Sequence, residues 1–244
     1  DDDRNEESPN IQNLLSRHSF PRGARVGVIL HSLMEDLDFQ TDDRSSLCDR
    51  TLRRLGLEDE WLPVLEQWVQ DILKASLGQF SLKDIGLTDR LDEMEFHFPL
   101  ATSTNLVQFL AEKGYLEGAS NKALLLQGQM TGLIDLLFRR DGKYYIADYK
   151  SNFLGNSLMD YNDESIAHAM QSHQYHLQYL IYSVAVHRML KQKLPGYQYE
   201  THMGGAYYLF LRGMNQQDSR GIFFTKPDLD TVARLDELLG GISG

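Results

Sequence analysis

Cysteine and long apolar runs are nearly absent from this sequence, and both absences narrow the class of protein. Cys48 is the single cysteine among 244 residues, so no intrachain disulfide can form and a reducing compartment is indicated. No stretch of about 18 apolar residues occurs, which excludes a membrane-spanning helix. Because the sequence also shows no secretory signal pattern, we expect a cytoplasmic protein.

Basic residues are also scarce. The chain holds 24 Lys and Arg against 35 Asp and Glu, which gives a formal net charge of -11. This balance argues against a free-standing nucleic-acid binder, because phosphate binding usually needs a basic surface. An enzyme of this charge that acts on DNA would need metal ions at its site and DNA delivered by a partner or an attached domain. The chain also lacks a Gly-x-x-x-x-Gly-Lys-Ser/Thr loop, which excludes a P-loop ATPase site.

Part of the acidic excess lies in the first residues. Residues 1–10 contain five acids and one arginine, and residues 1–19 as a whole are typical of a polar, acidic linker. The chain begins at Asp1 without Met, so we expect a piece of a longer protein. Its length suits one large domain or two small ones, and we place one domain at residues 20–244.

Hydrophobic periodicity predicts helices first, then strands, then further helices and strands. Helices are expected at residues 27–39, 59–76, 105–113, 164–193 and 230–239, and strands at 91–100, 205–212 and 221–224. Residues 41–57 are charged and show no clear pattern. The expected buried stripe of the first helix consists of Val28, Ile29, Leu33, Met34 and Leu37. This order predicts an α/β fold with a mixed central β-sheet flanked by helices.

A β-hairpin is the strongest local signal in the sequence. Two apolar runs within roughly residues 124–151 flank Asp141-Gly142, a dipeptide typical of a two-residue hairpin turn. If the turn is centred there, Asp135 and Asp148 face each other across the two strands. Like charges at directly opposed positions repel each other, and a divalent cation between the carboxylates would turn that repulsion into ligation.

Lys150 completes this candidate site. It lies two residues after Asp148, so the alternation of side chains along a strand places both on one face. Two carboxylates and an ammonium group then converge, which is an arrangement suited to metal-assisted phosphodiester cleavage. The plain alternative is a pair of solvated carboxylates, with Lys150 in a salt bridge to Asp148.

The order of the motifs resembles a known nuclease family. The phrases that carry the resemblance, spread over about residues 20–225, are His31-Ser-Leu-Met-Glu-Asp-Leu-Asp-Phe, Gly132-Leu-Ile-Asp-Leu, Asp148-Tyr-Lys-Ser-Asn, Gln178-Tyr-Leu-Ile-Tyr and Tyr208-Leu-Phe-Leu-Arg-Gly. Asp-x-Lys alone occurs in many proteins, whereas all the pieces in this order are highly specific. The chain is similar to the PD-(D/E)XK nuclease superfamily and, within it, to the RecB-type nuclease domains of bacterial exodeoxyribonuclease V.

The resemblance implies a metal site and a restriction-endonuclease-like fold. The implied metal ligands are His31, Asp135, Asp148 and the backbone carbonyl of Tyr149. Lys150 would position the attacking water and offset charge on the phosphate. The implied cofactor is Mg²⁺, with Mn²⁺ as a possible substitute. Many relatives carry Glu where this chain has His31, and imidazole is a softer ligand than carboxylate, which leaves the metal preference more open.

The resemblance also implies a substrate and partners. Gln178 and Tyr182 would line the groove near the substrate backbone, although both also suit the edge of a core. The implied activity is sequence-independent hydrolysis of DNA phosphodiesters, as an exonuclease or endonuclease on linear or single-stranded DNA. The implied setting is double-strand-break repair by recombination, with a helicase part of the same polypeptide, RecC and RecD subunits, and RecA recombinase as partners.

Two other functions fit the same residues. The first is an interaction module that docks a RecA-type recombinase and sister subunits and cuts poorly by itself, which the acidic net charge favours. The second is a different metallo-phosphoesterase on the same hairpin, such as a restriction or repair endonuclease.

For each of three further features, we consider two interpretations. Glu35 shares a helix face with His31 and either bonds its imidazole or is a plain surface acid. His173 and His176 are spaced like zinc ligands, but no further ligand follows at a suitable spacing, so we expect no zinc site. The tyrosines around 144–149 and 175–182 either stack on unpaired bases or, for most of them, pack against the sheet.

Overall fold

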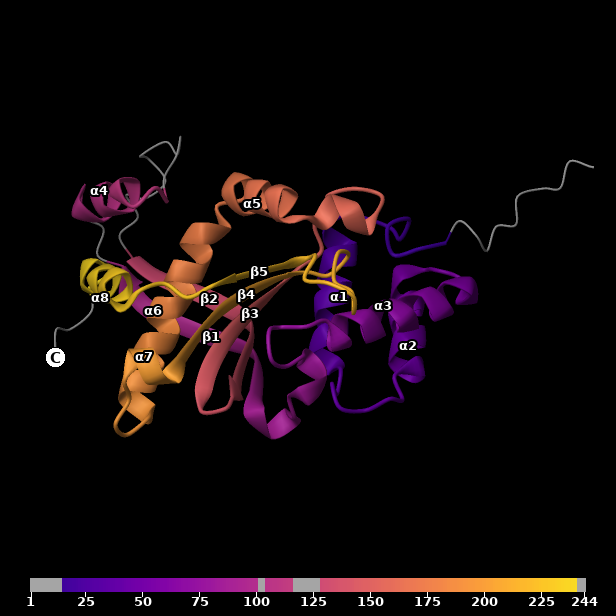
Figure 1. The fold of residues 1–244 in the computed structure, drawn as a ribbon, viewed down its shortest axis with the longest axis horizontal. Helices are drawn as coiled ribbons and strands as arrows, with labels where there is room; N and C mark the ends of the chain where they lie inside the picture. The colour runs from indigo at the N-terminus through magenta and orange to yellow at the C-terminus, as the bar shows by residue number, and fades with distance from the viewer. Residues whose placement is uncertain (1–14, 101–103, 116–127, 241–244) are drawn as a thin grey trace, which may run out of the picture. The chain divides into compact units, whose positions relative to one another are not determined.

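The computed structural model describes residues 15–100, 104–115 and 128–240 (Figure 1). Its helices and strands are, in chain order, α1 (Ala24–Asp36), α2 (Ser45–Leu55), α3 (Leu62–Lys74), β1 (Arg90–Leu100), α4 (Thr104–Glu112), β2 (Gly128–Arg140), β3 (Lys143–Lys150), α5 (Asp163–Ser172), α6 (Tyr175–Lys193), α7 (Tyr199–His202), β4 (Met203–Phe210), β5 (Ile222–Thr225) and α8 (Leu229–Leu238). Most of the predicted acidic linker lies outside the described residues. Among the helices within them, none has the length and apolar character needed to cross a membrane.

The chain divides into two compact units. The first unit contains the described residues up to Gly86 together with residues 149–162 and 210–222. The second unit contains the described residues of 87–148, 163–209 and 223–240. Helices α1, α2 and α3 therefore belong to the first unit, and most of the sheet with helices α4 to α8 belongs to the second. The division falls within β3, after Asp148, so Asp135 and Asp148 belong to the second unit, and His31, Tyr149 and Lys150 belong to the first.

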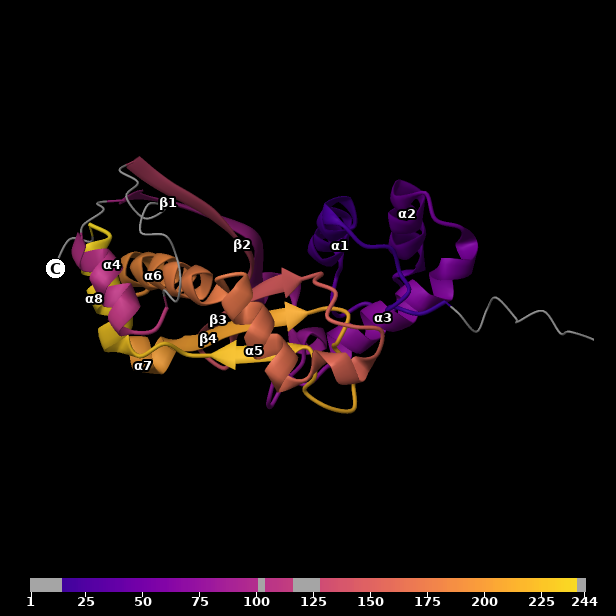
Figure 2. The same cartoon turned by 90° about the horizontal axis from the view of Figure 1, so that it is seen from above.

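The strands form one five-stranded sheet in the order β1-β2-β3-β4-β5. The pairs β1–β2 and β2–β3 are antiparallel. Figure 2 shows β3 and β4 pointing the same way and β5 pointing the opposite way. The sheet is therefore mixed, and the predicted α/β class with a mixed sheet and flanking helices is confirmed.

The hairpin turns where the sequence predicts it. Arg140 pairs with Lys143, which leaves Asp141 and Gly142 as the two turn residues. Their φ angles are 49° and 76°, so both lie in the left-handed region. A type I′ turn requires positive φ at both positions, and the Asp-Gly dipeptide satisfies this at low cost.

The register of this hairpin carries the two predicted acids to neighbouring strands. The pairing of β2 with β3 runs without interruption from the turn to Leu136 opposite Ala147. Asp135 directly precedes Leu136 on β2, and Asp148 directly follows Ala147 on β3. The turn therefore sets the register that leads to the two carboxylates, because the register of a short hairpin follows from its loop.

Helix α1 begins earlier than predicted, and four of the five residues predicted for its buried stripe are buried, namely Ile29, Leu33, Met34 and Leu37. Its buried residues are Val26, Ile29, Leu30, Leu33 and Met34. Val28, predicted to be in the stripe, is 65% exposed, so that part of the prediction is wrong. With about 3.6 residues per turn, Val28 lies well around the helix from the line through Val26, Ile29 and Leu33.

Residues 41–57, predicted to have no regular pattern, contain helix α2. Only Cys48, Thr51 and Leu52 of this helix are buried, so its apolar stripe is one turn long. Gly56 ends the helix in the left-handed conformation, with φ 72°, and its N–H reaches the carbonyls of Arg53 and Leu52. Gly56 was the feature of the sequence that indicated the end of a helix here.

The long helix predicted for residues 164–193 is two helices, α5 and α6. Figure 1 shows them as separate helices with different axes. Gln174 between them has φ 55° and ψ 32°, a left-handed conformation that ends one helix before the next begins. The prediction of one continuous helix is wrong here because glutamine gives no sequence signal for this conformation.

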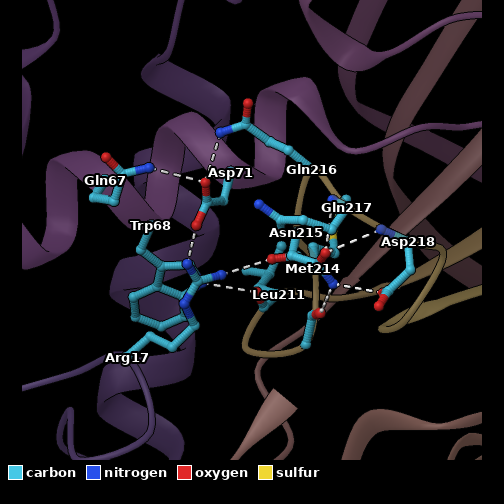
Figure 3. A network of polar contacts seen from close by, with 11 residues as sticks. Arg17, Gln67, Trp68, Asp71, Leu211, Met214, Asn215, Gln216, Gln217 and Asp218 are labelled. Atoms are coloured by element: carbon cyan, nitrogen blue, oxygen red, sulfur yellow. Dashed lines mark hydrogen bonds and ion pairs between the residues drawn. The ribbon is translucent and has the colours of Figure 1, made fainter. Parts of the chain in front are cut away.

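A polar network holds the first unit together (Figure 3). Arg17 forms an ion pair with Asp71 of α3 and donates a 2.6 Å hydrogen bond to the carbonyl of Met214. Gln67 and Gln216 both donate to Oδ1 of Asp71, at 2.9 and 2.7 Å. A carboxylate that accepts from three residues is well compensated for its burial, so the network fixes the segment after β4 on α3.

Arg212 is the buried centre of this segment. Its side chain is fully buried, and its guanidinium donates to the carbonyls of Arg17, Phe20 and Pro21 at 2.6, 3.1 and 2.6 Å. Trp68 of α3 donates its indole N–H to the carbonyl of the preceding residue, Leu211, at 2.7 Å. These bonds tie the residues after β4 to the N-terminal segment and to α3.

The turn can be tested through Gly142. A Cβ added at this glycine would meet nothing within 4 Å, so Gly142→Ala isolates the cost of positive φ. We expect the free energy of unfolding to fall by about 1 kcal/mol in urea titrations. Asp141→Asn is the matched control and should change little, because Asn tolerates the left-handed region. An unchanged stability in Gly142→Ala would contradict the turn assignment.

Candidate functional site

Asp135 and Asp148 share one neighbourhood in the second unit. Asp148 is only 2% exposed, and Asp135 is half-buried. Burial raises the pKa of Tyr182 and of Tyr208, and the negative charges of Asp148 and Asp135 raise both further. Both phenols therefore keep their protons at neutral pH and can act as hydrogen-bond donors.

These phenols belong to a chain of hydrogen bonds. The Tyr208 hydroxyl donates to Oε1 of Gln178 at 3.1 Å, and Nε2 of Gln178 donates to the Tyr182 hydroxyl at 2.8 Å. Tyr182 in turn donates to the carbonyl of Leu133 at 2.8 Å. Leu133 lies two residues before Asp135 on β2, so the chain fixes α6 beside the strand that carries this carboxylate.

The structure thus brings the predicted pair Gln178 and Tyr182 together. Tyr182 is 7% exposed and packs its ring edge-on against Phe96, with centroids 5.7 Å apart. Its hydroxyl is engaged with protein groups on both sides. The arrangement supports a positioning role for the pair between α6, β2 and β4, while the predicted approach to the substrate backbone stays a prediction.

The end of β3 carries the other predicted residues and lies in the first unit. Tyr149 and Lys150 are 1% and 8% exposed. The N–H of Leu211 donates to the carbonyl of Lys150 at 2.9 Å, which ties this end of β3 to the residues after β4. The His31 ring of α1 meets the Tyr149 ring edge-on, with centroids 6.0 Å apart and planes at 90°. His31 is therefore placed beside the residue that follows Asp148.

Gly27 explains how α1 approaches so closely. A Cβ built at Gly27 would lie 2.8 Å from Oγ of Ser151. A side chain at position 27 would require the Ser151 hydroxyl to move, so glycine allows this approach of the helix to the segment after β3 without a change of rotamer. His31 lies one turn further along the same helix face, so the contact at Gly27 sets the place of the imidazole against Tyr149.

Glu93 is a third acid that the sequence did not single out. The β1–β2 register pairs Asp92 with Leu136 and Met94 with Ile134, which leaves Glu93 at the position opposite Asp135. Its φ is 53°, a strained value for a strand residue with a side chain. Its neighbours Glu95 and His97 contact each other at 3.3 Å on an exposed face.

The donor chemistry fits a divalent cation. Carboxylates of Asp135 and Asp148 and a backbone carbonyl at Tyr149 are hard oxygen donors of the kind that Mg²⁺ prefers. A carboxylate as buried as Asp148 also gains from a nearby cation. In the described ranges, however, no three His, Cys, Asp or Glu side chains are drawn together at ligand distance. The full ligand set with His31 stays a prediction.

Comparison with known proteins gives a consistent family. The profile described as the PD-(D/E)XK nuclease superfamily matches residues 10–239. The chain is 38% identical over 237 residues to RecBCD enzyme subunit RecB of Escherichia coli (strain K12), which covers 94% of this chain and 20% of that protein. It is 36% identical over 238 residues to the subunit of the same name from Haemophilus influenzae, with 95% and 19% covered. The chain therefore spans about a fifth of the length of these relatives.

A double-mutant cycle tests the approach of α1. In a Ser151→Ala background, Gly27→Ala should raise the free energy of unfolding by up to about 1 kcal/mol, because alanine is the better helix former. With Ser151 present, the 2.8 Å contact should remove most of that gain. We expect a coupling of about 0.5–1 kcal/mol between the two sites, measured by chemical denaturation. Equal effects in both backgrounds would show that the two segments do not touch.

Proposed function

The chain belongs to the PD-(D/E)XK nuclease superfamily, and on this premise we propose that it hydrolyses DNA phosphodiester bonds without regard to base sequence. The observation that carries the proposal is the hairpin register. The register leads to Asp135 on β2 and to Asp148 on the adjacent strand β3, each one residue beyond the last pair. Lys150 lies two residues beyond Asp148. A site made of carboxylates and an ammonium group addresses the phosphate backbone, which is the same at every base.

Asp135 and Asp148 would hold a divalent cation, with His31 and the Tyr149 carbonyl as the further ligands that the family resemblance implies. We take Mg²⁺ as the ion and Mn²⁺ as a substitute. Such an ion, when bound, supplies Lewis-acid chemistry toward a phosphate oxygen. The contact of His31 with Tyr149 supports its place in this set, because Tyr149 directly follows Asp148.

Lys150 would act on the attacking water and on the phosphate. Its side chain is largely buried, so its ammonium group is held in a medium where charge interactions are stronger than in water. It would orient the water by a hydrogen bond and offset the negative charge that grows on the phosphate oxygens during attack. Its backbone carbonyl, fixed by Leu211, supports a constant position for the side chain.

The setting of this activity follows from the relatives. We propose that the chain works in a helicase–nuclease complex for double-strand-break repair by recombination in the cytoplasm. Its partners there are DNA, a helicase part of the same polypeptide, RecC and RecD subunits, and RecA recombinase. The support is the identity to subunits of enzymes named RecBCD, of which this chain matches one part.

An interaction module is the second candidate function. The net charge of -11 favours it, because an acidic surface repels DNA and suits basic protein surfaces. In that case the 244-residue chain would bind its partner proteins and cut DNA poorly by itself. Nuclease activity of the chain alone, in Mg²⁺, separates the two functions.

Asp148→Asn tests the assignment with little change of shape. We expect hydrolysis of linear DNA in Mg²⁺ to fall by at least about 100-fold, because the amide removes the negative charge that holds a cation. The assay measures acid-soluble nucleotides released, and thermal denaturation checks that the variant is folded. Asp141→Asn, in the exposed hairpin turn, is the matched control and should keep full activity. Undiminished hydrolysis by Asp148→Asn would sink the proposal.

Glu93 lies opposite Asp135 in the strand register, and its strained backbone allows a separate test of whether its carboxylate serves the site. Glu93→Gln keeps the left-handed backbone and removes the charge, whereas Glu93→Gly also relieves the strain. We expect both variants to lose nuclease activity, and the Gly variant to be more stable than the Gln variant by about 1 kcal/mol. Activity equal to wild type in both variants would remove Glu93 from the site.

A further inference from the structure

Two rings lie stacked where α5 ends and α6 begins. The rings of His173 and Tyr175 have centroids 5.2 Å apart and planes inclined by only 18°. Residues two apart on a continuous α-helix do not face each other, so this pair requires the break between the helices. Gln174 supplies the break with φ 55°, a conformation that costs a residue with a side chain roughly 1–2 kcal/mol. Retained strain of this kind often marks a functional segment.

A third ring connects this pair to the carboxylates. Tyr175 lies 5.6 Å from Tyr208 between ring centroids, with planes at 35°. Tyr208 is fully buried, and the charges of Asp148 and Asp135 contribute to raising its pKa. His173, Tyr175 and Tyr208 therefore form a row, here called the ring ladder. The His173 ring is exposed, the Tyr175 ring is half-buried, and the Tyr208 ring is buried near Asp148 and Asp135.

The surroundings of the ladder are aromatic and carry little charge. The first turn of α6 contains no acidic residue. His176 packs edge-on against Tyr179 and Phe223, with centroids 5.7 and 6.0 Å apart. Burial lowers the pKa of His176, so its ring is neutral at pH 7. A flat and neutral surface of this kind suits the faces of bases better than it suits phosphates.

We propose that the exposed and half-buried rings of this ladder, His173 and Tyr175, stack on unpaired bases of single-stranded DNA and lead the strand toward Asp135 and Asp148. The inference rests on the proposed nuclease function and names the residues that would hold the strand. Stacking needs no basic surface, so it offers a way for a chain of net charge -11 to hold DNA. It is also tolerant of sequence, because every base has a flat face.

Binding of a short thymidine oligonucleotide to the 244-residue chain tests the inference. The measurement is made in EDTA, so that no strand is cut, with fluorescence anisotropy of a labelled strand. We expect His173→Ala and Tyr175→Ala each to weaken binding by about 5- to 100-fold, the range for loss of one stacked base. His173→Phe and Tyr175→Phe keep a flat ring and should stay within about threefold of wild type.

An abasic strand of the same length provides the control for the bases themselves. It has the same phosphates but nothing to stack, so wild type should bind it at least as weakly as either Ala variant binds the thymidine strand. On the abasic strand, the Ala variants and wild type should bind equally weakly. Equal loss on both strands would overturn the inference, and so would unchanged binding in the Ala variants or no binding by wild type.

Folding and the nuclease proposal are kept separate from this test. Tyr175 contacts a buried ring, so Tyr175→Ala is compared with wild type by thermal denaturation. His173 is exposed, and His173→Ala gives the answer where the other variant is unfolded. Weakened binding in His173→Ala together with undiminished cleavage by Asp148→Asn would sustain the ladder and reject the proposed catalytic site. Lost cleavage by Asp148→Asn together with unchanged binding by His173→Ala would reject the ladder and sustain the proposed catalytic site.

Discussion

The buried guanidinium of Arg212 is the constraint on which the first unit depends. A cation taken out of water costs several kcal/mol unless its donors are satisfied, and here the carbonyls of Arg17 and Phe20 accept from it. The residue before it, Leu211, holds the carbonyl of Lys150. The backbone of Lys150, the predicted catalytic residue, is thus bonded to the residue next to this arginine. A cation–carbonyl cluster distant in sequence from the Asp-x-Lys motif orders the strand end that bears it.

The features of the fold that depend on neighbouring residues, such as the hairpin turn, were predictable from the sequence. Asp141-Gly142 predicts the turn and the register, and the register then leads to Asp135 and Asp148. The mixed sheet follows from the order of elements. The break at Gln174 was not predictable, because glutamine carries no local signal for the left-handed conformation that it adopts there. Local propensity alone favours one continuous helix there.

The candidate site divides in the same way. Spacing along β3 relates Asp148 to Lys150, whereas the engagement of Tyr182 with Leu133 joins elements far apart in the chain. No periodicity indicates that Gly27 lies against Ser151, since a glycine in a helix has several possible causes. The resemblance to known nucleases pointed to Asp148, Lys150 and Tyr182, and the coordinates give the physical reason for the place of Tyr182.

The hydrogen-bond chain through Gln178 has a fixed polarity. The carbonyl of Leu133 can only accept, so Tyr182 must give it its one proton. The oxygen of Tyr182 is then left to receive from the amide nitrogen of Gln178, and the amide oxygen receives from Tyr208. An ionised glutamate at position 178 would have no proton to donate to the Tyr182 oxygen. The direction of the chain could not reverse to compensate, because the Leu133 carbonyl cannot donate. Glutamine fits this position because its amide both accepts from Tyr208 and donates to Tyr182, as the Leu133 carbonyl at the end of the chain requires.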